Sequence, residues 1–126
     1  MMSTPCMIFM DTPISPKGIY CHYDGTLEHT GLTLYQHYNN EEKVKELITK
    51  GDTPGIQPTI EDMGFYGKHS ANPGHIKDYH NVYLFWDNEW YVKASHVLYN
   101  RGTNLAYYDN VLFEPLERAL KNKHLI

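Results

Sequence analysis

The chain has 126 residues, which corresponds to one domain and is long enough to bury a hydrophobic core without metal or disulfide support. Its 41% hydrophobic and 21% charged residues are ordinary for a globular protein and exclude wholesale disorder. The formal net charge of -4 provides no bulk attraction to a phosphate backbone, so extended nucleic acid is not an expected partner.

The N-terminus, MMSTPCMIFM, lacks the basic region and the long apolar run of a secretory signal. Nowhere does the sequence approach the ~20 apolar residues that span a bilayer. We therefore expect a soluble protein of the cytoplasm without a membrane partner. In that compartment Cys6 and Cys21 are expected to be reduced and partly buried, although a bridge between neighbouring strands is conceivable.

The first predicted elements are two strands, over residues 6–10 and 18–23, joined by the turn-forming segment DTPISPKG. Side chains alternate between the two faces of a strand. In the second strand Ile19 and Cys21 are therefore expected to face inward, and Tyr20 and His22 to face outward or toward a ligand.

The pattern then changes to a helical period. Thr26 is a candidate cap for a first helix that has an apolar stripe and Gly31 at a close-approach position. A second helix is predicted over residues 41–51, with Asn39 and Glu42 at capping-box spacing and Gly51 closing the end.

The C-terminal half begins with an irregular segment over about residues 52–81, where only a brief helical turn near Thr59 to Met63 is expected. Strands over 82–86 and 89–94 flank an Asp87-Asn88 turn. A weaker strand is expected near SHVLYN or LAYYDN, before a last helix that starts at Pro115. The order predicts a single α+β domain over residues 1–126, with an antiparallel sheet of four to five strands and two to three helices packed on one face.

The stretch GIYCHYDGTLEHTGLTLYQHYNNEEKVKELITKGD resembles a family of small, largely uncharacterised phage and bacterial proteins. Its members carry an IYCHWDG-like strand and turn, a helix ending in HY, and a KV-x-x-LI helix followed by GD. The likeness is good over residues 17–52 and looser over 82–120, and it departs at Tyr23 and Leu27, where the family favours tryptophan and proline. The resemblance implies a phage-linked origin and the α+β layout; it implies no activity.

A metal site is the first chemical candidate, because His22 and Asp24 share a strand face and His29 follows on the helix. The sequence contains none of the CxxC, HxxxH or HExxH spacings, so no metal and no cofactor are expected. The simpler interpretation is that Asp24 and Gly25 form the turn into the helix while His22 hydrogen-bonds its neighbours. A third interpretation is contact with a ligand that is not a metal.

Nucleophilic catalysis requires a thiol or hydroxyl beside a base. Cys21 and His22 are adjacent in sequence, but the pleat directs them to opposite faces, so no catalytic residue is assigned. Backbone N–H groups at the DGT segment could attract a phosphate, although the carboxylate of Asp24 opposes this.

Two further groups are candidate ligand contacts. In the loop, basic Lys68, His69 and His75 alternate with tyrosines and could clamp a nucleotide; the alternative is a solvated loop without a role. At the hairpin, Trp86 and Trp90 form either a cross-strand contact or an exposed binding hot spot.

These observations predict a small phage-type accessory protein that acts by binding, and we expect it in the host cytoplasm. It would inhibit a host or anti-phage defence protein, or sequester a nucleotide signal in a pocket between protomers of a homo-oligomer. The alternative is a small nucleotide-directed hydrolase or lyase that uses His22 and Asp24 with a loop histidine. The candidate contact residues are Tyr20, His22, Asp24, His29, Lys68, His69, His75, Trp86 and Trp90.

Overall fold

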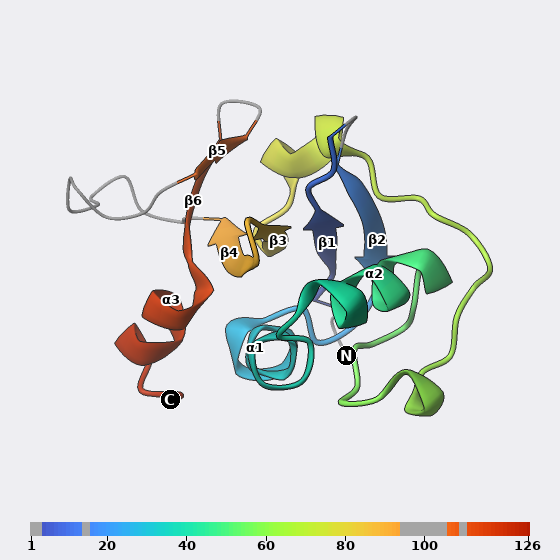
Figure 1. The fold of residues 1–126 in the computed structure, drawn as a ribbon, viewed down its shortest axis with the longest axis horizontal. Helices are drawn as coiled ribbons and strands as arrows, with labels where there is room; N and C mark the ends of the chain where they lie inside the picture. Colours follow the sequence, from blue (N-terminus) through green and yellow to red (C-terminus); the bar gives the residue numbers. More distant parts are fainter. Residues whose placement is uncertain (1–3, 14–15, 94–105, 109–110) are drawn as a thin grey trace.

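The computed structural model describes residues 4–13, 16–93, 106–108 and 111–126, the third range by its backbone alone (Figure 1). Its strands are β1 (Cys6–Met10), β2 (Lys17–Cys21), β3 (Val82–Trp86), β4 (Glu89–Lys93), β5 (Ala106–Tyr108) and β6 (Val111–Pro115). Its α-helices are α1 (Leu32–His37), α2 (Glu41–Lys50) and α3 (Leu116–Asn122). Shorter helical turns are η1 (Leu27–Gly31), η2 (Ile60–Asp62) and η3 (Pro73–Asp78).

The strands form one mixed sheet in the order β2-β1-β3-β4-β6-β5, which confirms the α+β class. All neighbouring pairs are antiparallel except β1 and β3, which run parallel. The parallel pair arises because the chain leaves β2, passes through the helices and returns on the far side of β1. An all-antiparallel sheet of four to five strands was expected, and the six described strands include this one exception.

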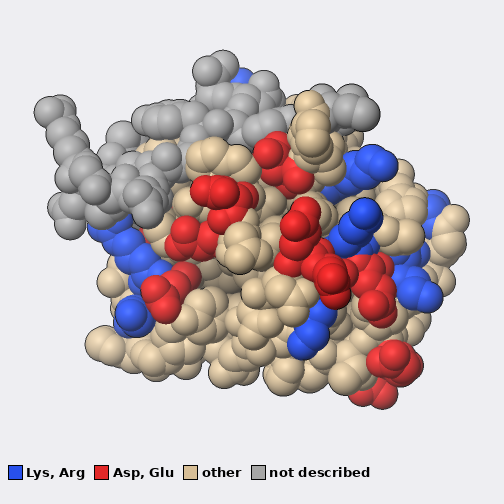
Figure 2. All heavy atoms as spheres, in the orientation of Figure 1, with Lys and Arg blue, Asp and Glu red and all other residues tan. Residues whose placement is uncertain are grey.

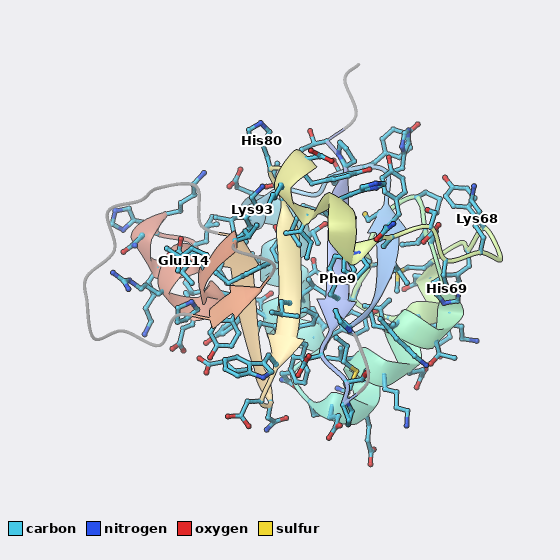
Figure 3. All side chains as sticks on the ribbon, turned by 90° about the horizontal axis from the view of Figure 1, so that it is seen from above. Phe9, Lys68, His69, His80, Lys93 and Glu114 are labelled. Carbon is cyan, nitrogen blue, oxygen red and sulfur yellow. The ribbon has the colours of Figure 1, made fainter. Side chains whose placement is uncertain are left out.

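Both faces of the sheet are covered. Cys6, Ile8 and Met10 of β1 pack with buried residues of α1, α2 and α3. On the opposite face, Phe9 packs with Ile76 of η3, which Figure 3 shows lying across the strand that carries Phe9. The segment expected to be irregular therefore helps to cover the second face, because its short 3-10 helix buries Ile76 against β1 and β3.

Several sequence predictions are confirmed at the level of local structure. Helix α2 has the predicted extent, and Gly51 ends it with a φ of 101°. The cap is Asn40 rather than Asn39, since the Asn40 side chain accepts a 2.9 Å hydrogen bond from the Lys43 N–H. Asp87 and Asn88 adopt positive φ values of 50° and 62°, as the hairpin turn between β3 and β4 requires.

Other predictions were wrong in their boundaries. Strand β2 ends at Cys21, two residues earlier than expected, because the chain turns at Asp24, whose φ is 58°. Residues 111–115 form strand β6 directly before α3, so Pro115 is the last strand residue and precedes the helix. The helical turn near Thr59 to Met63 is present as η2, and LAYYDN supplies β5. SHVLYN lies outside the described residues.

Gly25 is a position where only glycine fits. A Cβ added there would lie 2.7 Å from the Cys6 Cβ and 2.7 Å from the backbone oxygen of Thr4. The Gly25 carbonyl also accepts a 2.8 Å hydrogen bond from the buried hydroxyl of Tyr83. The turn that follows β2 is thereby pressed against β1.

We expect Gly25→Ala to lower the free energy of unfolding by about 2 kcal/mol or more, because a backbone atom must shift to admit the methyl group. Gly64→Ala is the matched control, since its Cβ would meet nothing within 4 Å. Urea titrations of both variants provide the comparison. Equal unfolding midpoints for the two would show that Gly25 is not closely packed.

The raised pKa values of two buried tyrosines predict that the protein loses stability at alkaline pH. Burial, followed by the nearby charges of Glu61 and Glu46, raises the pKa of Tyr38 to about 12. Burial also raises the pKa of Tyr83 well above its ordinary value. In the unfolded chain tyrosine ionises near ~10, so from there upward the unfolded state releases protons that the folded state retains.

Stability is therefore expected to fall as the pH rises from about 10 to about 12. Tyr38→Phe should reduce the slope of this fall, since it removes one of the two phenols. Urea midpoints measured between pH 8 and 11 test the effect. A midpoint independent of pH in wild type would contradict it.

Candidate binding surface

A buried carboxylate organises the outer side of β2. Asp52 has no exposed surface, and its Oδ1 accepts a 2.8 Å hydrogen bond from the Tyr20 N–H. Its Oδ2 accepts a 2.9 Å hydrogen bond from the Ser70 N–H and another from the Ser70 hydroxyl. Asp52 thereby joins β2 to the loop that follows η2.

The residues after Asp52 continue along the edge of β2. The Thr53 N–H donates to the Tyr20 carbonyl at 3.0 Å, and the Thr53 carbonyl accepts from the His22 N–H at 3.2 Å. The Tyr23 N–H then donates to the Pro54 carbonyl at 2.8 Å. These bonds fix the backbone of residues 20–23, and therefore the directions of their side chains.

Five rings gather on this scaffold, and we name them the tyrosine cluster: Tyr20, His22, Tyr23, Tyr66 and Tyr79. The Tyr20 hydroxyl lies 2.9 Å from His22 Nδ1, and the Tyr20 and Tyr79 ring centroids are 6.3 Å apart in an edge-on arrangement. The His22 ring stands edge-on to Tyr23 with centroids 4.4 Å apart. The Tyr66 N–H donates to the Asp52 carbonyl at 2.9 Å, which places this residue beside the Asp52 anchor of Tyr20.

The tyrosine cluster is accessible to a partner. Tyr23 is 46% exposed and Tyr66 is 51% exposed, while the other three rings are half-buried. Burial raises the pKa of Tyr20, and the neighbouring Tyr79 hydroxyl adds to the effect. The phenol of Tyr20 is therefore neutral at physiological pH and offers a partner an uncharged ring and a hydroxyl group.

The helical face differs in character. Figure 2 shows acidic and basic side chains interspersed there, and α2 contributes exposed Glu41, Glu42, Lys43, Lys45 and Glu46. Mixed charges of this kind are typical of a solvated face. The tyrosine cluster is thus distinguished from this face by its concentration of tyrosine rings.

The thiol and the imidazole lie apart. Cys21 is fully buried and pairs in register with Cys6 of β1, and both cysteines are free. The Cys21 Sγ donates a hydrogen bond to the Tyr23 carbonyl at 3.1 Å, whereas His22 bonds the Tyr20 hydroxyl. Burial raises the pKa of the Cys6 thiol, which favours the unreactive protonated form.

Asp24 and His29, which were proposed to bind a metal with His22, do not lie together at one site. Asp24 is an exposed turn residue whose backbone carbonyl accepts a 2.6 Å hydrogen bond from the Thr30 hydroxyl. His29 Nε2 donates to the Ile56 carbonyl at 3.0 Å. Within the described ranges, no three His, Cys, Asp or Glu side chains are placed to hold a metal ion.

The basic loop residues do not form a single clamp. His69 Nε2 donates to the Ile48 carbonyl at the end of α2, at 2.9 Å, and Figure 3 shows Lys68 further out on the same side. His75 is exposed on η3, a separate element. At the end of η3, the Lys93 Nζ donates to three backbone carbonyls, those of Ile76, Lys77 and Tyr79.

Trp86 and Trp90 lie on opposite faces of the sheet. They therefore form neither a cross-strand contact nor an exposed pair, the two arrangements expected from the sequence. Trp86 lies opposite Glu89 and is 40% exposed, with its ring centroid 5.7 Å from that of Tyr91. Trp90 lies opposite Phe85 and is only 5% exposed, and its Nε1 donates to the Tyr38 carbonyl at 2.7 Å. Trp90 is therefore mainly a core residue.

The residue that sequence reasoning missed is Asp52. An aspartate in a Gly-, Thr- and Pro-rich segment is usually assigned to a turn. The available signal was the Gly51-Asp52 pair, which directly follows the second predicted helix.

No protein-family model, curated protein or solved structure matches the chain. In the part of the chain that the structure describes, no helix has both the length and the hydropathy needed to cross a membrane. The functional inference therefore depends on the geometry of the surface.

Proposed function

We propose that this chain is a small, phage-type accessory protein that acts by binding another macromolecule through the tyrosine cluster. The observation that carries the proposal is the cluster itself, in which exposed Tyr23 and Tyr66 stand beside three half-buried rings. The resemblance to phage and bacterial proteins makes a host or anti-phage defence protein the proposed target.

Tyrosine suits this role for physical reasons. Each ring provides a large contact area with few rotatable bonds, and its hydroxyl can hydrogen-bond a partner at the rim. The cluster is also held in place before binding, because the backbone beneath it is bonded to Asp52, Thr53 and Pro54. A surface that is already ordered loses less entropy when a partner docks.

The chemistry required for the hydrolase alternative is less well supported. A base that activates water needs a free nitrogen and an orienting group. The Tyr20 hydroxyl could orient His22 through Nδ1, but among the described residues no hydrogen bond joins His22 to Asp24, the second residue that this alternative requires. Capture of a nucleotide is the second candidate function, since bases stack on tyrosine rings.

The test is purification of the wild-type protein from a bacterial host under native conditions, followed by native mass spectrometry. A host polypeptide bound in a fixed ratio supports the proposal, while a bound nucleotide points to sequestration. Turnover of a nucleotide that is lost in both His22→Ala and Asp24→Ala would establish the enzymatic alternative and overturn the binding proposal.

A further inference from the structure

A hollow of about 200 Å³ lies where α1, α3 and the β3–β4 hairpin meet. Phe85 and Trp90 line its inner part; both are buried in the core on the helical side of the sheet, with ring centroids 5.1 Å apart. Tyr35 of α1, which is half-buried, adds a third ring. None of these rings belongs to the tyrosine cluster, so the hollow is a separate surface.

The charged groups of the hollow are acidic. Glu89 of the hairpin and Glu117 at the start of α3 both line it and are exposed. Among the described residues that line the hollow, none is a lysine, an arginine or a histidine. Figure 2 shows acidic side chains gathered over this part of the surface. The hollow therefore favours a positively charged ligand.

The two carboxylates are bonded mainly to uncharged donors, which leave their negative charge in place. The Tyr35 hydroxyl donates a 2.6 Å hydrogen bond to Glu117 Oε1, and the Tyr91 hydroxyl lies 3.4 Å from Glu89 Oε2. The one cation nearby is Lys121, whose Nζ lies 4.0 Å from Glu117 Oε2. Both of these side chains are more than half exposed, so their ion pair is weak and can be exchanged for a ligand.

Size and shape narrow the choice of ligand. A volume of about 200 Å³ is below the roughly 300–1,000 Å³ of pockets that enclose a whole small molecule, and it suits a single side chain. A guanidinium group is planar, stacks on aromatic rings and carries five hydrogen-bond donors, whereas an ammonium group acts as a point charge. The side chains of Asn39 and Asn88, which are exposed and also line the hollow, offer amide oxygens as further acceptors.

We infer that this hollow binds an arginine side chain of a partner protein, with the guanidinium group against the aromatic rings and paired with Glu89 and Glu117. A cation is attracted to the face of an aromatic ring, and arginine is among the residues that most often anchor protein interfaces. The inference goes beyond the proposed function, because it concerns a second surface and neither site requires the other.

The experiment is an NMR titration of the ¹⁵N-labelled chain with the peptide Ac-Gly-Arg-Gly-NH₂, and with the same peptide carrying citrulline, the uncharged counterpart of arginine. We expect shifts at the Asn88 and Glu89 amides and at the Trp90 indole N–H, with the arginine peptide binding about fivefold more tightly. Glu89→Gln/Glu117→Gln should abolish this preference, because it removes both charges at nearly constant shape. Glu41→Gln, at an exposed position of α2 outside the hollow, is the matched control and should retain it.

Lys121 provides a second check on the assigned pairing. Lys121→Gln should tighten the binding of the arginine peptide about twofold, because it removes the cation that competes for Glu117. Weaker binding in this variant would contradict the inference.

Equal binding of the two peptides by the wild-type chain would also overturn it, as would an arginine preference that Glu89→Gln/Glu117→Gln retains. The arginine site is likewise excluded if neither the Asn88 amide nor the Trp90 indole N–H shifts at millimolar peptide concentration. A captured host protein together with equal peptide binding would leave the proposed function intact. An arginine preference lost in the double glutamine variant, with no host partner found by native mass spectrometry, would uphold the arginine site while the proposed function failed.

Discussion

Replacing Asp52 by alanine is expected to lower the free energy of unfolding by about 3–5 kcal/mol, because hydrogen bonds to a charged group contribute roughly 1.5–3 kcal/mol each and are not fully additive. The carboxylate accepts hydrogen bonds from the Tyr20 N–H, the Ser70 N–H and the Ser70 hydroxyl. Its loss leaves the Tyr20 N–H without its acceptor beneath the tyrosine cluster. Urea unfolding monitored by far-UV circular dichroism measures the effect.

Two milder variants provide an internal scale. Ser70→Ala removes only the hydroxyl donor and should lower the free energy of unfolding by about 1 kcal/mol. Asp52→Asn retains one acceptor oxygen but turns an amide N–H₂ toward a donor. Its loss of unfolding free energy should therefore lie between those of Ser70→Ala and Asp52→Ala. A free energy of unfolding for Asp52→Ala within about 1 kcal/mol of wild type would contradict the assigned role.

The second large effect concerns binding. The double variant Tyr23→Ser/Tyr66→Ser is expected to bind the captured partner about 100-fold more weakly or worse, since buried tyrosine hot spots contribute about 2 kcal/mol or more each. Both rings are exposed in the free protein, so stability should change little. Surface plasmon resonance or calorimetry with the purified partner measures the loss.

Trp86→Ser is the matched control, because Trp86 is also a large, exposed aromatic residue and lies at the β3–β4 hairpin instead. Its affinity should stay within about threefold of wild type. Equal loss in the control and in the double variant would show that exposed aromatic area in general, and not the tyrosine cluster, determines binding.

The regular elements could be predicted from the sequence because their local signals agree with the tertiary structure. Helix α2 combines an apolar stripe of Val44, Leu47 and Ile48 with a terminal glycine, and the β3–β4 hairpin has Asp87-Asn88 at its turn. Strand β6 was missed because its apolar run merges into the apolar start of α3 without a break. A short apolar run does not by itself distinguish a strand from the start of a helix.

The candidate surface could be predicted only in part. The alternation of β2 placed Tyr20 and His22 together, and the structure joins them by a hydrogen bond. Tyr66 and Tyr79 join them through the path of the loop, which buried Asp52 and Ile76 set by long-range contacts. The separation of Trp86 from Trp90 depends on strand register, which their spacing in sequence did not reveal.

The most direct test of the central claim is hydroxyl-radical footprinting of the free chain and of its complex with the captured partner. Protection on binding should be strongest at Tyr23 and Tyr66, with Trp86 labelled equally in both states. Unchanged labelling of Tyr23 and Tyr66 together with protection at Trp86 or on α2 would contradict binding through the tyrosine cluster.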